Sequence, residues 1–232
     1  TNISHEFRTP LTIISGMIDQ VRSKPDQWLE KGASMIKQNT LTLLQLVNQI
    51  LELRKLEHKE LSLKLVQGDV VQYVRHISSP YQSYAENKGI QLHFNSKLAS
   101  LTMDYDPEKI LRVISNLLSN AIKFTPKEGQ IYLQLSRHKK ELKIKIQDTG
   151  IGISASSLPH IFDRFYQIEH PKEASPQGSG IGLALVKDLI ELMKGKIKVE
   201  SELNKGTSFI IRLPITQTAT LQSKLSKSVE QY

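Results

Sequence analysis

Two segments at the start of the chain carry apolar residues at the three- and four-residue spacing of an amphipathic helix. In residues 1–22 these positions are Ile3, Phe7, Leu11, Ile14, Ile18 and Val21. A second stripe repeats the same steps from about Trp28 to Glu57. Ser23-Lys24-Pro25-Asp26 lies between them and has the composition of a connector. The pattern therefore predicts an antiparallel helical hairpin.

The second helix has more apolar residues than one partner helix can cover. Its stripe contains Leu29, Ala33, Ile36, Thr40, Leu43, Val47, Ile50 and Arg54, with Leu44, Leu46, Leu51 and Leu53 beside it. Because two helices cannot bury so wide a surface, we expect two copies of the hairpin to form a homodimeric four-helix bundle. The alternative is a hairpin that packs on the rest of its own chain.

From residue 59 the spacing changes to strand-like alternation mixed with helical segments. Strands are expected at 61–66, 90–94, 101–103, 131–136, 142–147, 196–200 and 207–213, and helices after Asp69, from Pro107 to Phe124 and over 180–193. This order predicts an α+β fold, in which a mixed sheet is covered by helices on one face of an α/β sandwich. We expect a helical domain over 1–58, a second domain over 59–215, and a tail or linker over 216–232.

His5 is the first residue whose chemistry stands out. At about 100° per residue, a helical His5 points away from the apolar seam and shares a face with Thr9. A neutral imidazole is a good nucleophile at physiological pH, and the neighbouring Glu6 can accept the proton lost during attack. An inert surface side chain is the ordinary interpretation of a lone exposed histidine, so a reactive site needs support from elsewhere in the chain.

A second polar group of residues lies on the helix that ends at Phe124. Asn116, Asn120 and Lys123 are spaced by four and three residues, so two amides and one ammonium share a face. Amide oxygens suit Mg²⁺, and a lysine charge suits phosphate. A solvated polar helix face would show the same spacing, and the spacing alone leaves that alternative open.

Two glycine-containing turns complete the candidate residues. Asp148-Thr149-Gly150-Ile151-Gly152 follows a strand, where a carboxylate can accept a hydrogen bond from an exocyclic amine such as that of adenine. Gly178, Gly180 and Gly182 lead into a helix, an arrangement that gathers phosphates. Neither a Walker lysine nor the Rossmann spacing is present. About two dozen residues of little regular pattern separate the turns and predict a nucleotide lid.

The order of these motifs resembles that of the sensor histidine kinases of two-component systems. Residues 4–12 resemble their phosphoacceptor box, and the later stretches resemble the conserved boxes of their GHKL-type ATP-binding domain, up to about residue 214. The resemblance implies an ATP-dependent kinase that phosphorylates His5 and passes the phosphoryl group to an aspartate of a response-regulator receiver, with receiver phosphatase activity. The alternative is an ATP-hydrolysing conformational clamp of the same nucleotide-binding fold that forms no phosphohistidine.

The resemblance also implies a role for each candidate residue. His5 is the acceptor, Glu6 the base, and Thr9 the residue that orients water for receiver dephosphorylation. For Mg-ATP the implied residues are Asn116, Asn120, Lys123, Phe124, Asp148, Gly150, Gly152, Arg164, Gly178, Gly180, Gly182 and Thr207, with Asn116 and Asn120 as metal ligands. Gln167 stands where relatives often have arginine. Two alternatives follow: Arg164 replaces that charge, or the lid contributes less to phosphate binding. An Arg164→Ala variant with unchanged ATP affinity and autophosphorylation would exclude the first alternative.

The composition of the chain excludes several other classes of site and function. The chain has 232 residues and no cysteine, which excludes disulfides, thiolate metal sites and cysteine nucleophiles. Its net charge of +8 is dispersed, and the basic run at 137–140 fits a hairpin tip, so no direct nucleic-acid partner is expected. No segment reaches the roughly 18 to 20 apolar residues of a membrane span.

We therefore expect a cytoplasmic domain of an inner-membrane receptor whose sensor region and membrane span lie upstream, outside this chain. The receiver acts in trans or is fused downstream, as in hybrid receptors.

Overall fold

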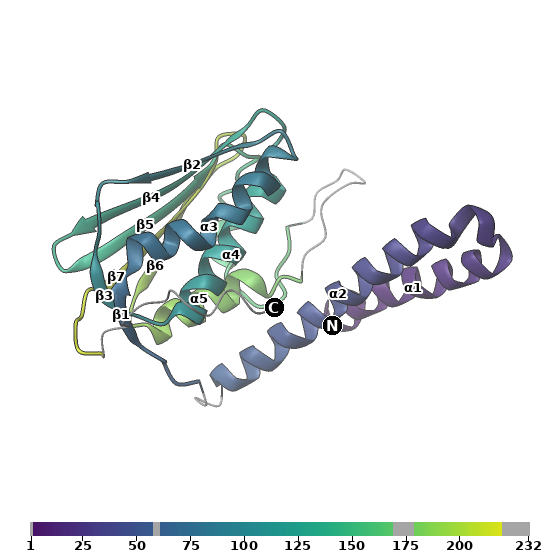
Figure 1. Ribbon diagram of the computed structural model, residues 1–232, viewed down its shortest axis with the longest axis horizontal. Helices are drawn as coiled ribbons and strands as arrows, with labels where there is room; N and C mark the ends of the chain where they lie inside the picture. The colour runs from purple at the N-terminus through teal and green to yellow at the C-terminus, as the bar shows by residue number, and fades with distance from the viewer. Residues whose placement is uncertain (1, 58–60, 169–178, 220–232) are drawn as a thin grey trace. The chain divides into compact units, whose positions relative to one another are not determined.

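The computed structural model describes residues 2–57, 61–168 and 179–219 of the chain (Figure 1). The chain separates into two compact units. The first contains residues 1–61 together with 163–185, and the second contains residues 62–162 together with 186–232. The two long helices at the start of the chain belong to the first unit, and the β-sheet belongs to the second.

The first unit is mainly a hairpin of two helices, α1 (Asn2–Ser23) and α2 (Pro25–Glu57), which lie side by side (Figure 1). Pro25 is tolerated at the start of α2 because its missing N–H has no helical partner there. The helices approach closely at Gly32, where a Cβ would lie 2.5 Å from Val21 Cγ2. The predicted hairpin is confirmed, although α2 begins at Pro25 rather than near Trp28.

Much of the apolar surface of this hairpin is open to solvent in the single chain. Leu46 and Leu53 are buried. The exposed apolar side chains on the two helices are Leu11, Ile18, Leu29, Leu41, Leu44, Val47 and Leu51. An exposed set of this size is the mark of a surface that another protein surface covers.

The second unit is built on a five-stranded sheet with the order β2-β4-β5-β7-β6. The strands are β2 (Gln91–Ser96), β4 (Gln130–His138), β5 (Glu141–Asp148), β6 (Lys196–Glu202) and β7 (Gly206–Pro214). β2 and β4 are parallel, and the other neighbouring strands are antiparallel. The sheet is therefore mixed, as predicted.

Helices α3 (Val70–Glu86), α4 (Pro107–Phe124) and α5 (Gly182–Leu192) lie on one face of this sheet (Figure 1). Asp69 caps α3 by accepting hydrogen bonds from the N–H groups of Val71 and Gln72. Asp106 caps α4 by accepting from the N–H of Lys109 at 3.1 Å. Alternate residues of the strands meet the apolar faces of the helices in the core, which includes Leu117, Leu118, Leu133, Leu135, Ile144, Ile146 and Leu189.

A short antiparallel pair, β1 (Val66–Asp69) and β3 (Thr102–Tyr105), leads into α3 and α4. The predicted strand at 61–66 is wrong in position. Val66 already pairs with Tyr105, the last residue of β3, so the ladder has no room for residues 61–65. The N–H of Lys64 donates instead to Asp106 Oδ2 at 2.8 Å. The alternation at 61–65 thus reflects partial burial without strand pairing.

The segment after β7 stays attached to β3 through Asp104. The N–H and hydroxyl of Thr218 donate to Asp104 Oδ2 at 2.6 and 2.9 Å, and the N–H of Ala219 donates to Oδ1 at 3.2 Å. Burial by itself raises the pKa of Asp104, but these hydrogen bonds outweigh it and lower the pKa to about 2. The first residues of the expected tail therefore pack on the second unit, and residues 220–232 lie outside the described residues.

Candidate active site

The first turns of α1 carry the candidate residues of the phosphoacceptor box. Glu6 and Thr9 are half-buried, and Pro10 beside them is buried. His5 lies in the same helix, but its side chain is outside the described residues. Since residues four apart are neighbours on a helix, positions 5 and 9 share one face of α1.

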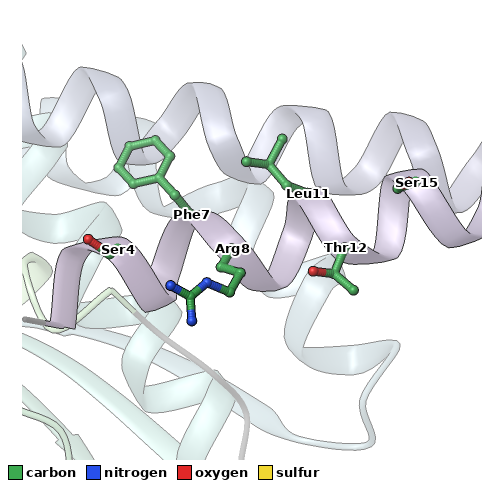
Figure 2. Close-up of a pocket in the computed structure, with 6 residues that line it drawn as sticks. All are labelled: Ser4, Phe7, Arg8, Leu11, Thr12 and Ser15. Atoms are coloured by element: carbon green, nitrogen blue, oxygen red, sulfur yellow. The ribbon is translucent and has the colours of Figure 1, made fainter.

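A pocket of about 580 Å³ runs along the same part of α1 (Figure 2). Its lining residues are Ser4, Phe7, Arg8, Leu11, Thr12 and Ser15, all on this one helix. Phe7 and Leu11 point to one side of the helix, and Arg8 and Thr12 point to the other (Figure 2). Because one helix lines it and Leu11 is 53% exposed, this is an open surface and no enclosed nucleotide site.

Gln167 contacts the candidate base, Glu6. Its Nε2 donates a 2.8 Å hydrogen bond to Glu6 Oε1, and both residues belong to the first unit. A neutral amide donor binds a carboxylate more weakly than a guanidinium does. Glu6 therefore has an uncharged partner at this position.

The described ends of the predicted lid segment meet at Gly180. Its carbonyl accepts a 2.9 Å hydrogen bond from the N–H of Phe165, and its φ is +62°. A Cβ there would lie 2.7 Å from the Phe165 backbone, so glycine is required at this close approach. Arg164 is exposed, Gly182 begins α5, and Gly178 lies outside the described residues.

Helix α4 presents the second set of candidate residues on one side. Asn116, Asn120, Lys123 and Phe124 are all half-buried. Asn116 donates from Nδ2 to the carbonyl of Arg112 at 2.8 Å, a bond that uses the amide nitrogen and not the oxygen that binds cations. The Lys123 ammonium lies 5.0 Å from the centroid of the Phe124 ring, within cation–π range. Two amide oxygens and one ammonium can thus act together here.

Asp148, the last residue of β5, is the buried centre of the candidate nucleotide site. It is 6% exposed. Its Oδ1 accepts hydrogen bonds from the N–H of Gly150 at 2.8 Å and from the N–H of Thr207 at 3.2 Å. Burial raises the pKa of Asp148, and the backbone hydrogen bonds oppose that rise without cancelling it. Because both donors use Oδ1, Oδ2 is better placed to accept a hydrogen bond from a ligand.

Gly150 sits where no side chain fits. A Cβ at this position would lie 2.4 Å from the carbonyl oxygen of Phe124 and 2.7 Å from Asp148 Oδ1. The next N–H, that of Ile151, donates to the same Phe124 oxygen at 3.2 Å. The turn that follows Asp148 is therefore packed directly on the end of α4, which joins the two sets of candidate residues into one site.

Ser201 of β6 is a residue that sequence reasoning missed. Its hydroxyl accepts from the N–H of Ile153 at 2.8 Å, donates to the carbonyl of Gly206 at 2.8 Å, and lies 2.9 Å from Thr207 Oγ1. It thereby ties the loop that contains Gly152 to the start of β7. No local pattern marks this serine among the polar residues of β6, because its role follows from strand register.

The residues of the second unit fit a purine nucleotide with Mg²⁺. The buried carboxylate of Asp148 suits an exocyclic amine, and the glycine backbone beside it allows close approach of a ring. In the described ranges, no cluster of three or more His, Cys, Asp and Glu residues could hold a metal. The amide oxygens of Asn116 and Asn120 are of the chemical type that could hold a cation together with phosphates, which is how Mg²⁺ binds with nucleotides.

Two protein-family models match the chain. The model described as "His Kinase A (phospho-acceptor) domain" matches residues 1–59. The model described as "Histidine kinase-, DNA gyrase B-, and HSP90-like ATPase" matches residues 105–217. Together they span about three quarters of the chain.

Individual proteins resemble it over nearly the whole length. "Histidine kinase P4" of Formosa agariphila is 36% identical over 100% of this chain and 18% of that protein. "Sensor histidine kinase YclK" of Bacillus subtilis is 32% identical over 93% of this chain and 46% of that protein. The solved structure of full-length ShkA in complex with AMPPNP matches with a TM-score of 0.73 at 27% identity, over 93% of this chain and 45% of that chain.

The chain spans less than half the length of each of these proteins. Among its described helices, none has the length and apolar character needed to cross a membrane.

Proposed function

Since the chain belongs to the sensor histidine kinases of two-component signalling, we propose that it is an ATP-dependent protein-histidine kinase with His5 as phosphoacceptor. One observation carries this proposal. A segment that matches a phosphoacceptor domain shares the chain with a nucleotide site built around the buried carboxylate of Asp148.

In the proposed reaction a ring nitrogen of His5 attacks the γ-phosphorus of ATP. The bond from that phosphorus to the bridging oxygen breaks, and ADP leaves with the electron pair. Glu6 accepts the ring proton as the phosphohistidine forms. Phosphoryl transfer depends mainly on positioning and charge neutralisation, so the residues that hold the triphosphate supply most of the rate.

Within the second unit, Asp148 recognises the exocyclic amine of adenine, helped by Thr207 and by the backbone at Gly150 and Gly152. Asn116 and Asn120 hold Mg²⁺, which neutralises phosphate charge when bound. Lys123 contacts phosphate, and Phe124 supports its ammonium through the cation–π contact at 5.0 Å. Arg164 and the glycines at 178, 180 and 182 act from the lid.

The phosphoryl group of His5 then passes to an aspartate of a receiver domain, which restores the neutral imidazole. Thr9 lies one helical turn from His5 and orients water when the receiver is dephosphorylated. The receiver acts in trans or is fused downstream. In the whole protein the chain is the cytoplasmic part of an inner-membrane receptor, with its sensor and membrane span upstream.

The hairpin forms a homodimer in this proposal. The exposed leucines of α1 and α2 and the open surface at Phe7 and Leu11 are apolar enough to be covered by a second hairpin. The match to a phospho-acceptor domain supports the same arrangement, because the resemblance to histidine kinases implies that this segment dimerises.

Incubation with γ-labelled Mg-ATP tests the function directly. Wild type should take up label that is lost in acid and kept in base, and His5→Ala should take up none while binding ATP normally. ATP hydrolysis at equal rates in both proteins, without label, would support the conformational clamp instead. Asn120→Ala is the complementary control, since it should lose nucleotide binding and labelling together.

A further inference from the structure

The face of the sheet that points away from α3, α4 and α5 carries an unusual arrangement of charge. Along β5, buried Leu142, Ile144 and Ile146 alternate with half-buried Lys143 and Lys145, so the lysines point away from the helices. On β7 the exposed Arg212 follows the same rule, since its neighbours Ile211 and Leu213 are buried.

Strand register places these cations directly opposite one another. Arg212 of β7 pairs with Lys143 of β5 on one side and with Lys196 of β6 on the other. In the next row, Ile210 of β7 lies between Lys145 and Lys198. The set of Lys143, Lys145, Lys196, Lys198 and Arg212 is here called the cationic grid.

The row of Lys143, Arg212 and Lys196 destabilises the sheet. Neighbouring strands are about 4.8 Å apart, and like charges directly opposite each other are destabilising. Two carboxylates reduce the repulsion at the margins. Glu141 lies 3.5 Å from Arg212, and Glu200 lies 2.7 Å from Lys198. Five cations therefore face two anions, and the excess is positive.

The field of the grid extends beyond its ion pairs. The pKa of Glu200 is lowered first by its hydrogen bond and charge interaction with Lys198, and further by the charges of Lys145 and Lys143. Those two lysines are on β5, two strands away from β6. An anion placed over the grid would therefore interact with several of its cations at once.

We propose that the cationic grid is a docking surface for an acidic patch on a partner protein. Charge complementarity requires an anionic occupant, and the half-buried Ile210 between two lysines offers an apolar contact at the centre. The carboxylates of Glu141 and Glu200 favour a protein partner over a lipid bilayer or a nucleic acid. A continuous anionic surface would also face these two carboxylates, whereas a protein can set its own carboxylates over the cations alone.

The surface is separate from the proposed catalytic residues, so the inference goes beyond the kinase activity. Its test compares two double variants that remove the same amount of positive charge. Lys143→Glu with Lys196→Glu alters the row of the grid that contains Arg212. Lys97→Glu with Lys140→Glu alters two exposed lysines outside it. ATP affinity should be unchanged in both variants, which shows that each is folded.

The probe is a synthetic helical peptide with glutamates four residues apart, measured at low salt. Wild type should bind it, with affinity that falls as salt rises. The grid variant should bind at least about tenfold more weakly, and the control variant within about threefold of wild type. Equal weakening in both variants, or no binding by wild type, would overturn the proposal.

Two further probes test whether the surface binds a lipid bilayer or a nucleic acid instead of a protein. Vesicles with phosphatidylglycerol and a short DNA duplex should bind the wild type and the grid variant equally. If the wild type does not bind the peptide but binds vesicles or DNA, and only the grid variant loses that binding, the surface would be assigned to lipid or nucleic acid instead.

A stability measurement distinguishes docking from a structural role. Lys143→Gln should raise the thermal midpoint while weakening peptide binding, because it relieves repulsion from Arg212. A fall in the midpoint would mean that Lys143 stabilises the sheet, and the docking argument would fail.

Discussion

The N–H of Thr207 donates a 3.2 Å hydrogen bond to the buried carboxylate of Asp148, which joins the first residues of β7 to the last residue of β5. The carboxylate also accepts a hydrogen bond from Gly150, so the turn that follows β5 and the start of β7 are both held by it. A buried anion held in this way is costly to stability and useful for recognition.

Asp148→Asn should therefore keep or raise the stability of the fold while it weakens the binding of ATP. Burial raises the pKa of Asp148, so its ionised form opposes folding at neutral pH. The variant should unfold at the same or a higher temperature at pH 7, and that advantage should shrink as acid protonates wild type. ATP affinity should fall by about 10- to 100-fold, which corresponds to the free energy of one lost hydrogen bond to a charged group. Calorimetry with and without ATP tests both, and a less stable variant at pH 7 would contradict the argument.

Gly150→Ala should weaken ATP binding by about tenfold or more, because the new methyl group would meet the Phe124 carbonyl and force α4 away from Asp148. Gly16→Ala in α1 is the matched control, since a Cβ there meets nothing within 4 Å. That change should leave ATP affinity unaltered and raise helix stability by about 0.5–1 kcal/mol. Fluorescent nucleotide titration measures both, and normal binding by Gly150→Ala would show that the contact is not needed.

Thr9→Ala should reduce dephosphorylation of a phosphorylated receiver more than it reduces labelling of His5. The reason is that its proposed role is to orient water and not to contact ATP. Both rates can be followed with the same labelled protein and an added receiver. An equal loss of the two activities would remove Thr9 from the phosphatase reaction.

Leu44→Glu should convert a dimer to a monomer, because this side chain of α2 is 56% exposed in the single chain and would carry a charge into an apolar interface. Tyr84→Glu on α3, where the native residue is 46% exposed, is the control and should leave the mass unchanged. Sedimentation measures the mass of each. A monomeric wild type would refute the homodimer.

Asp104→Asn should remove a contribution to the stability of the fold that wild type loses at low pH. The native pKa of about 2 lies below the ordinary value of 3.8, so ionised Asp104 stabilises the fold above about pH 4, and this contribution is lost as pH falls toward 2. The variant should be less stable at pH 7 and lose less on acidification. Hydrogen exchange at Thr218 and Ala219 should become faster. Unchanged exchange there would show that Asp104 does not hold this segment.

The local pattern of the chain was sufficient for most of the elements. The steps of three and four residues in α1 and α2, and the caps at Asp69 and Asp106, depend on residues that are neighbours in sequence. The strand predicted at 61–66 failed for the opposite reason. Whether those residues pair depends on where β3 ends, more than 35 positions later in the chain.

The same distinction holds in the candidate site. The sequence by itself determined the helical hairpin, the mixed sheet covered by helices, the family resemblance and the residues proposed for catalysis, because each rests on spacing within segments or on the order of segments along the chain. Only the tertiary structure decided that Thr207 reaches Asp148, that Ser201 ties two loops together, and that Arg212 lies between two lysines. These relationships depend on strand register, and register is set by packing between segments that are distant in the sequence.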